Sequence, residues 1–456
     1  MKQVRLHIQS LPVYTPAGDP IYASGNFNDW DTGDAKYQFQ READGTYILE
    51  LETQLTEIQF RCHRGSWNLA EGDEQAKPNP IRDVLLVERT HIIPIHISSW
   101  IDFSHEHFAH TASSNVRVIH PEFYIPQLNR IRRVIAYLPT DYFLSSKRYP
   151  VLYMQDGQNI FDTWETISGE WNVDDALDSF FNEHGKSAIV IGIDNGGRKR
   201  IDEYAPWIND EEGGGEGSAY AAFLAETLKP FIDKNLRTLP DREHTGIIGS
   251  SMGGLISLFT ALKYQDLFGA AAIFSPSLWF SDHIFNFIKM KGCLFPQRFM
   301  LLAGGRESDF MTTDILKLYF ALLDAGFDSK NIFLDIRRNG THSEWFWRSA
   351  FPSCFRQMFF PGTAERDVWK NSIPAIIHFN TQSFCLEVNI DQRIINPAIK
   401  IKDINGSLVR VRTLFYCNNY IKLPGDKQIF IVELYNENKL FYSSQISVVA
   451  QWQMTG

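Results

Sequence analysis

The sequence predicts an α/β domain with a mostly parallel sheet, flanked by a smaller β domain on either side. From residue 115 to 362, apolar runs typical of buried strands alternate with segments of helical periodicity, a pattern that parallel sheets produce. Residues 1–110 and 365–456 instead carry short alternating segments separated by turn residues, which are typical of β-sandwiches. We therefore expect three domains within these bounds.

The composition narrows the classes of partner and cofactor. A net charge of −10 disfavours nucleic acid and anionic membranes, which select basic surfaces, so we expect neither as a partner. The 5 cysteines are widely spread without a CxxC pair, so we expect neither a disulfide framework nor a Cys-type zinc site. We also expect no cofactor and no metal.

The start of the chain lacks the apolar segment of a signal peptide, and no apolar run of about 18 residues follows anywhere. We expect a cytoplasmic protein, or a secreted one if a leader has been removed. The oligomeric state is left open.

In the first domain, one segment resembles a known binding motif. The expected strands cover residues 4–8, 47–51 and 58–62. Residues 23–30, Ala-Ser-Gly-Asn-Phe-Asn-Asp-Trp, resemble the signature of starch- and glycogen-binding modules, and residues 60–67 resemble the strand that follows in such modules when they precede an esterase. Aromatic faces stack on sugar rings, so Trp30 and Trp67 are candidates for a glycan platform. The alternative is that both tryptophans belong to the core of the sandwich.

A polar linker is expected from residue 101 to about 120. It contains His105, His107 and His110, a cluster able to ligate a metal ion, but no fourth ligand and no periodicity fix its geometry. We expect a solvated linker rather than a metal site.

The middle domain is expected to alternate strands and helices. The expected strands cover residues 133–139, 149–155, 188–193, 245–248, 299–303 and 332–336. The expected helices cover residues 173–183, 219–235, 253–264 and 312–325. Residues 210–217, Asp-Glu-Glu-Gly-Gly-Gly-Glu-Gly, are too polar and Gly-rich to pack, so they predict a mobile surface loop and a candidate lid.

The segment 249–254, Gly-Ser-Ser-Met-Gly-Gly, lies between an expected strand and an expected helix. Strand, Gly-flanked turn and helix are the context of a G-x-S-x-G nucleophile elbow, in which Ser251 is the nucleophile. The strained turn requires small neighbours, and Gly249 and Gly253 meet that need. The alternative is a Gly-rich helix start without chemistry.

Several collinear segments within residues 115–360 resemble the esterase family of α/β-hydrolases, which includes feruloyl esterases, enterochelin esterases and S-formylglutathione hydrolases. These segments are residues 137–139, 149–159, 200–206, 249–254 and 274–279. The resemblance implies the α/β-hydrolase fold and ester hydrolysis, but it does not identify the acyl group or the alcohol.

A serine nucleophile needs a base that accepts its proton and an acid that orients the base, in the chain order serine, acid, histidine. His342 lies in a Gly-containing loop just after an expected strand, and the family's histidine occupies a comparable segment. A histidine that merely caps a helix is the alternative. For the acid, Glu307 fits the family's G-x-x-E/D turn from Gly304, and Asp309 remains the alternative.

Two backbone N–H groups are expected to stabilise the oxyanion. One belongs to Met252, the residue after the nucleophile, and the second to Gln158, in a turn where Gly157 permits close approach of the backbone. The alternative is that Asp156 and Gly157 make an ordinary tight turn.

Three further residues are candidate substrate contacts. Arg200 is expected in a structural or pocket-wall cluster with Glu203 and Tyr204. Trp279 and Trp345 are expected either to line an aromatic acyl pocket or to pack in the core.

In the last domain, the expected strands cover residues 399–403, 408–411 and 429–434. The domain loosely resembles the C-terminal sorting domains of type IX secretion, but it lacks a clear Gly-x-Tyr after Leu423-Pro424. We expect a packing or binding sandwich.

These expectations together indicate a serine carboxylic-ester hydrolase that works through an acyl-enzyme. Its substrate is expected to be a small-molecule or glycan ester of the acetyl, feruloyl or siderophore type. An acyltransferase would use the same acyl-enzyme with a sugar hydroxyl in place of water. The third hypothesis is a non-catalytic glycan-binding protein with a hydrolase-like scaffold, and the set of Ser251, Glu307 and His342 argues against it.

Overall fold

The structure is a computed structural model that describes residues 1–12, 15–16, 18–42, 45–73, 78–104, 110–166, 169–361, 373–380, 385–416, 418–424 and 429–447. The chain forms two compact units, Met1–Thr111 with Asp162–Gly169, and Ala112–Phe161 with Glu170–Gly456. The second unit combines the expected α/β domain with the expected C-terminal domain, and the two share one hydrophobic core.

An eight-stranded sheet forms the centre of the second unit, in the order β10-β11-β13-β12-β16-β17-β18-β19. Strand β11 pairs antiparallel with both neighbours, and the other pairs are parallel. The strands are β10 (Val116–Ile125), β11 (Arg130–Tyr137), β12 (Val151–Met154), β13 (Ile189–Ile193), β16 (Thr245–Ser250), β17 (Ala270–Phe274), β18 (Arg298–Gly304) and β19 (Ile332–Arg337). Strands β12, β13, β16 and β17 are buried throughout, because helices cover the sheet on both faces.

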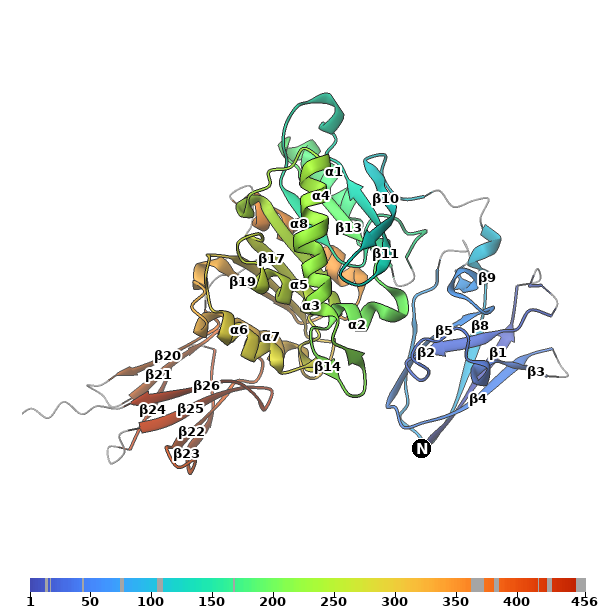
Figure 1. The fold of residues 1–456 in the computed structure, drawn as a ribbon. Coiled ribbons are helices and arrows are strands. Elements are labelled where there is room, and N and C mark those ends of the chain that lie inside the picture. The colour runs from blue at the N-terminus through green and yellow to red at the C-terminus, as the bar shows by residue number, and fades with distance from the viewer. Residues whose placement is uncertain are drawn as a thin grey trace, which may run out of the picture. The chain divides into compact units, whose positions relative to one another are not determined.

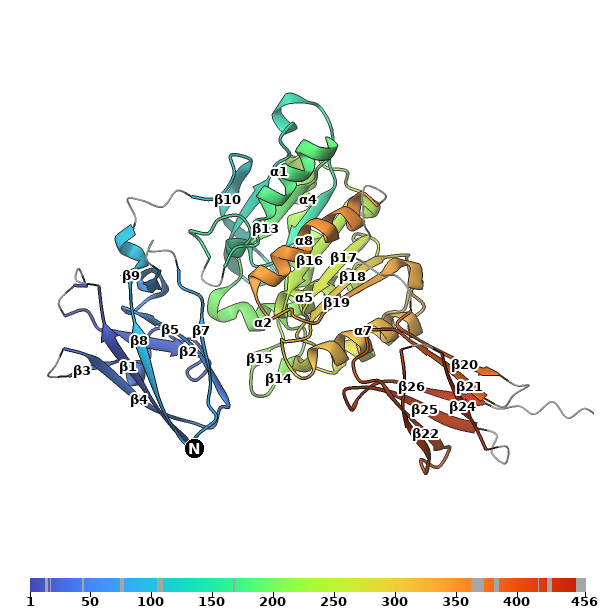
Figure 2. The ribbon, with the colours of Figure 1, turned by 180° about the vertical axis from the view of Figure 1, so that it is seen from behind.

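The helices on the two faces bury separate hydrophobic cores. One face carries α1 (Val173–His184) and α8 (Glu344–Phe359), which lie in front of the sheet in Figure 2. The opposite face, toward the viewer in Figure 1, carries α2 (Arg200–Tyr204), α3 (Gly217–Ala222), α4 (Lys229–Asn235), α5 (Met252–Lys263), α6 (His283–Lys291) and α7 (Met311–Asp324). A π-helical stretch, Phe223–Leu228, joins α3 to α4, so the expected helix over 219–235 is confirmed.

The predicted loop over 210–217 is wrong in one respect, because the segment packs. Strand β14 (Ile208–Asn209) pairs with β15 (Gly213–Gly214) in a small hairpin. The Gly214 N–H donates to the Asp202 carboxylate at 3.0 Å, and a Cβ on Gly214 would lie 2.5 Å from the Trp207 carbonyl oxygen. The glycines therefore permit close packing and positive φ values rather than marking a segment that cannot pack.

The C-terminal segment forms the expected sandwich of two small sheets. Its strands are β20 (Ala375–Asn380), β21 (Cys385–Ile390), β24 (Asn418–Lys422), β22 (Ala398–Asp403), β23 (Leu408–Thr413), β25 (Ile429–Asn436) and β26 (Lys439–Ser447). It packs on α7, where the ring of Phe320 lies 5.7 Å from that of Phe441 and 4.8 Å from that of Tyr442. The Asn436 amide donates to the hydroxyls of Thr312 and Thr313 at 3.2 and 3.0 Å.

The first unit is a β-sandwich of sheets β3-β4-β1-β8 and β2-β5-β7, with a short pair β6-β9. Its strands are β1 (Lys2–Ser10), β2 (Tyr22–Gly25), β3 (Gln40–Arg41), β4 (Tyr47–Thr53), β5 (Glu57–His63), β6 (Glu71–Gly72), β7 (Arg82–Leu85), β8 (Thr90–His96) and β9 (Ser99–Trp100). Alternating residues of β1 (Val4, Leu6 and Ile8) point into its core, as the sequence predicts.

The linker histidines are only partly within the described residues. His105 and His107 lie outside them, and His110 hydrogen-bonds the Asp162 carboxylate through Nδ1 at 2.6 Å. Within the described ranges, no three His, Cys, Asp or Glu side chains gather as a metal site requires.

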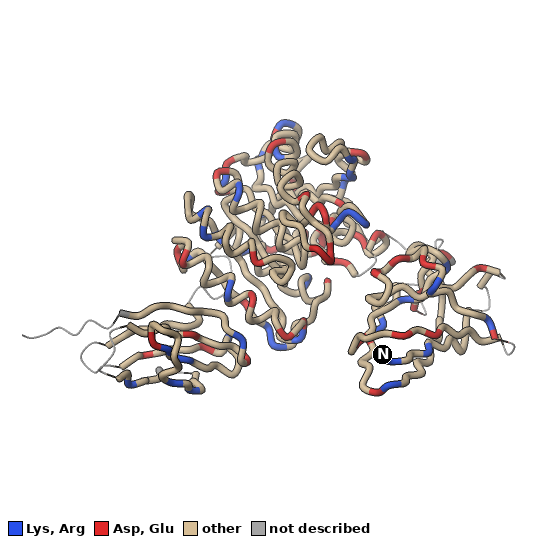
Figure 3. Tube along the Cα trace, turned by 60° about the horizontal axis from the view of Figure 1, so that its bottom comes forward, with Lys and Arg blue, Asp and Glu red and all other residues tan. Residues whose placement is uncertain are grey.

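Two further observations concern the surface and the helices. Figure 3 shows Lys and Arg interspersed with Asp and Glu along the strands of both β domains. Of the helices in the described part of the chain, none is long and apolar enough to cross a membrane.

Candidate active site

The candidate site lies where neighbouring parallel strands of the central sheet end. In the register of the sheet, Ser250 of β16 pairs with Phe274 of β17, and Phe274 pairs with Leu302 of β18. Because the carboxyl ends of parallel strands meet at one edge, the segments after β16, β17, β18 and β19 come together. These segments contain Ser251, Ser275, Ser277, Glu307 and His342.

Ser251 sits in the strained turn that a nucleophile elbow requires. Its φ of 56° and ψ of −125° are unusual for a residue with a Cβ, and α5 begins at the next residue. A Cβ on Gly249 would lie 2.3 Å from the Gly253 carbonyl oxygen, so the turn closes only over glycine. The Ser251 N–H donates to the Phe274 carbonyl at 3.0 Å, which fixes the turn against β17.

Glu307, rather than Asp309, contacts the histidine. His342 Nδ1 lies 2.7 Å from Glu307 Oε2, and the Glu307 side chain is only 1% exposed. The carboxylate can only accept, so Nδ1 carries the proton and Nε2 is left with a lone pair. Asp309 is exposed, and its backbone oxygen accepts a hydrogen bond from Lys439 of the C-terminal sandwich.

A second layer of hydrogen bonds holds Glu307 in place. Its Oε1 accepts from the Gly304 N–H and, at 2.8 Å, from the Ser275 hydroxyl. Ser275 Oγ in turn accepts from Trp347 Nε1 at 2.8 Å. Sequence reasoning did not identify Ser275 or Trp347, although the segment 274–279 that resembles the esterase family contains Ser275.

The hydroxyl of Ser251 has a second serine as its neighbour. Ser251 Oγ lies 3.3 Å from Ser277 Oγ, and the Ser277 N–H donates to the Ser251 carbonyl at 3.1 Å. Among the described residues, no hydrogen bond joins Ser251 to His342. Such catalytic contacts commonly tighten only when substrate binds.

Two backbone N–H groups beside the elbow have no acceptor within the described part of the chain. They belong to Met252 and Gln158, the two expected oxyanion donors. The Gln158 side chain is fixed because its Oε1 accepts from the Asn195 N–H at 3.1 Å. Gly157 is required here, since a Cβ would lie 2.8 Å from the Asp194 nitrogen.

Arg200 pairs with Asp156 and lies over the ring of Tyr204, whereas Glu203, the third member of the expected cluster, pairs with Arg130 and Arg132. Arg200 binds the Asp156 carboxylate through two hydrogen bonds of 2.6 and 2.9 Å. Burial alone would lower the pKa of Arg200, but the charge and hydrogen bonds of Asp156 outweigh burial and raise the pKa above its usual value. The pair fixes the turn that carries Gln158, because Asp156 also accepts from Asn195 Nδ2 at 2.7 Å.

Trp279 and Trp345 are surface residues, so the core-packing alternative is wrong for both. Their exposed fractions are 60% and 52%. Trp279 follows Ser277 by two residues, and Trp345 follows His342 by three at the start of α8. Exposed aromatic side chains therefore flank the segments that carry the site.

In the first unit, Trp30 and Trp67 lie against each other outside the core. Their ring centres are 6.1 Å apart at 45°, and both side chains are half-buried. The hydrophobic core of this unit includes Trp100 but neither Trp30 nor Trp67, so the core-packing alternative is wrong here too. The asparagines of the signature build the turn: Asn28 Oδ1 accepts from the Gly25 N–H at 2.8 Å, and Asn26 Oδ1 accepts from the Gln59 N–H at 3.0 Å.

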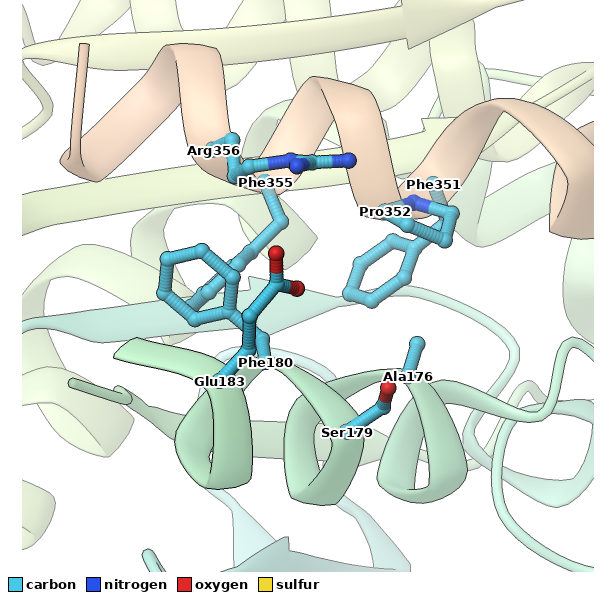
Figure 4. A pocket seen from close by; sticks show the side chains of 8 residues that line it. All are labelled: Ala176, Ser179, Phe180, Glu183, Phe351, Pro352, Phe355 and Arg356. Carbon is cyan, nitrogen blue, oxygen red and sulfur yellow. The ribbon is translucent and has the colours of Figure 1, made fainter. Parts of the chain in front are cut away.

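A small cavity of about 70 Å³ lies elsewhere in the second unit, between α1 and α8 (Figure 4). Phe180 of α1 and Phe351 and Phe355 of α8 line it, together with Pro352, which lies inside α8. Its walls include no residue of the candidate site, so we assign it no function.

A family model covers the segments that carry the candidate site, and two sequence relatives match about half of the chain. A family model described as "Putative esterase" matches residues 125–358, just over half of the chain. YbbA of Bacillus subtilis is 28% identical over 243 residues, which cover 50% of this chain and 92% of that protein. YjcH of the same species is 30% identical over 203 residues, covering 44% of this chain and 79% of that protein. A crystal structure of the enterobactin esterase of Shigella flexneri aligns with a TM-score of 0.46 and 15% identity, over 75% of this chain and 88% of that one.

Proposed function

Because this chain belongs to the esterase family of α/β-hydrolases, we propose that it is a serine carboxylic-ester hydrolase that works through an acyl-enzyme on Ser251. The observation that carries the proposal is the hydrogen bond between Glu307 and His342, beside a serine held in a strained elbow. A histidine that merely caps a helix has no need of a buried carboxylate partner.

In the proposed mechanism, His342 is the general base. The Nδ1–H donated to Glu307 leaves the Nε2 lone pair to accept the Ser251 proton as Oγ attacks the ester carbonyl. Buried Glu307 stabilises the imidazolium that forms. His342 then returns the proton to the departing alcohol, which leaves the acyl group on Ser251.

The proposed oxyanion donors are the N–H groups of Met252 and Gln158. Developing negative charge on the carbonyl oxygen would be stabilised by two donors that have no other acceptor. The N-terminus of α5 adds a favourable dipole at the same place. After acylation, a water molecule repeats the attack with His342 again as the base.

The exposed aromatic residues support an acyl or alcohol group with a flat face. Trp279 and Trp345 offer exposed apolar surface on the segments that carry Ser277 and His342, and an aromatic acid such as a ferulate suits such surface. The adjacent pair Trp30 and Trp67 supports a glycan-linked ester, with the first unit binding the sugar. We therefore propose carbohydrate-linked aromatic or acetyl esters as the substrate class.

The test is a screen of acetyl, feruloyl and siderophore esters with the wild-type protein and the Ser251→Ala variant. We expect hydrolysis of at least one class, and a loss of about 10⁴-fold or more in kcat for the variant. The matched control is Ser257→Ala, which removes a buried hydroxyl from α5 that has no hydrogen-bond partner. Wild-type activity in Ser251→Ala would overturn the proposal.

A further inference from the structure

Ser277 is a buried serine whose position is fixed against the nucleophile. It is only 3% exposed, and its hydroxyl lies 3.3 Å from Ser251 Oγ. Its N–H donates to the Ser251 carbonyl at 3.1 Å, so two separate contacts tie the two serines together.

The loop that carries Ser277 is held closely against the elbow. A Cβ on Gly254 would lie 3.0 Å from the Phe274 carbonyl oxygen and 3.3 Å from the Pro276 Cα. Pro276 fixes its own φ, and its carbonyl accepts from the Leu278 N–H at 2.8 Å. The Ser277 hydroxyl therefore reaches the reacting oxygen from a rigid backbone.

We infer that Ser277 is a further catalytic residue, whose hydroxyl donates a hydrogen bond to Ser251 Oγ as that oxygen leaves the acyl group. The inference rests on the proposed acyl-enzyme. In the hydrolytic step, water adds to the acyl carbon and gives a proton to His342. The bond between the acyl carbon and Oγ then breaks, Oγ takes the electron pair, and His342 returns the proton to it. Ser277 keeps its own proton throughout.

The hydrogen bond from Ser277 should accelerate deacylation rather than acylation, because Ser251 Oγ is a different kind of acceptor in the two steps. In the free enzyme Ser251 Oγ is a hydroxyl oxygen, a good acceptor both before and during its attack. In the acyl-enzyme it is the alkoxy oxygen of an ester, a weak acceptor that gains negative charge only as it leaves. A hydrogen bond that strengthens only on the way to the transition state accelerates that step.

The experiment measures kcat and the acylated fraction of the enzyme during steady-state hydrolysis of a saturating p-nitrophenyl ester. Intact-protein mass spectrometry after acid quenching gives the fraction, and kcat divided by the fraction is the deacylation rate constant. The variants are Ser277→Ala and Ser277→Thr, with Ser257→Ala as the matched buried-serine control and a thermal unfolding curve for each.

For Ser277→Ala we expect deacylation to slow about tenfold, as for loss of one hydrogen bond to a developing charge, with more acyl-enzyme present and kcat/KM nearly unchanged. Ser277→Thr, which keeps the hydroxyl, should recover most of the rate. An unchanged deacylation rate constant would overturn the role of Ser277. So would a fall in kcat/KM as large as the fall in the deacylation rate constant. Absence of an acyl adduct in the wild-type protein would instead overturn the proposed function.

Discussion

At the level of single residues, Trp347 sets the direction of hydrogen bonding around the acid. Its Nε1–H can only donate, so the Ser275 hydroxyl that accepts it must donate to Glu307 Oε1. The other carboxylate oxygen is then directed at His342 Nδ1. One buried chain of donors thus fixes both the orientation of the acid and the tautomer of the base.

Replacing Glu307 should cost far more activity than replacing Asp309. Glu307→Gln removes the charge that orients and stabilises His342, so we expect kcat to fall by about 10³- to 10⁴-fold. Asp309→Asn changes an exposed side chain and should leave kcat within about twofold. Steady-state kinetics with one aryl ester separates the two, and a larger loss in Asp309→Asn would reverse the assignment of the acid.

The ring of His63 is buried, and its centre lies 5.2 Å from that of the Trp67 ring. Burial lowers the pKa of His63 to about 4. The neutral ring donates from Nε2 to Ser24 Oγ, since that hydroxyl donates to the Asp31 carbonyl, and Nδ1 accepts from the Gly65 N–H at 3.1 Å. Protonation of Nδ1 would break the bond to Gly65.

Between pH 4 and pH 6.5 the unfolded chain therefore binds more protons at His63 than the folded one does. This contribution to stability is complete above pH 6.5 and is lost as the pH falls toward 4, by about 3 kcal/mol in all. Urea unfolding at pH 7 and pH 5, for the wild-type protein and His63→Gln, checks it. An equal pH dependence in both proteins would show that His63 is not the group responsible.

At the level of elements, the sequence predicts the strands that are long, apolar and flanked by turn residues, and it misses others for physical reasons. Strand β17 consists mainly of alanine, which has no strand preference, and it is buried on both faces, so no alternation marks it. Helix α8 contains Pro352, which argues against a helix interior. The hairpin of β14 and β15 was missed because its glycines serve close packing.

The residues of the candidate site could likewise be predicted from the sequence only in part. Ser251 and His342 follow from motif and chain order, and the G-x-x-E/D spacing from Gly304 favours Glu307 while leaving Asp309 as the alternative. In the structure, the burial of Glu307 and its contact with His342 distinguish the two carboxylates. Ser275 and Ser277 depend on the sheet register that places the loop after β17 against the elbow, and no local pattern reveals that register.

Because the C-terminal sandwich packs on α7, we expect the contact between them to contribute to the free energy of unfolding. Asn436 is fully buried, and its amide bridges the hydroxyls of Thr312 and Thr313 at the start of α7. Asn436→Ala should lower the free energy of unfolding by about 1–3 kcal/mol, because buried polar groups lose their partner. Urea unfolding followed by tryptophan fluorescence is the measurement. Asn405→Ala, in the exposed turn after β22, is the matched control, and equal midpoints would exclude the bridge as a stabilising contact.

At the level of the whole molecule, the proposed glycan platform and the proposed esterase site belong to separate units. If Trp30 and Trp67 bind a glycan, Trp67→Ala should abolish the retardation of the full chain in affinity electrophoresis on starch, xylan or β-glucan. Turnover of a small aryl ester should be unchanged, since that substrate needs no glycan contact. Trp164→Ala, an exposed tryptophan of the same unit, is the control. Equal retardation of the wild-type protein and Trp67→Ala would remove the glycan role.

Covalent labelling tests directly whether Ser251 is the nucleophile that His342 and Glu307 activate. A fluorophosphonate reacts covalently with such a serine, and peptide mapping by mass spectrometry locates the adduct. We predict a single adduct on Ser251 in the wild-type protein, and labelling slowed by about 10³-fold or more in His342→Ala, which lacks the base. An adduct on another residue, or equally fast labelling in His342→Ala, would contradict the account.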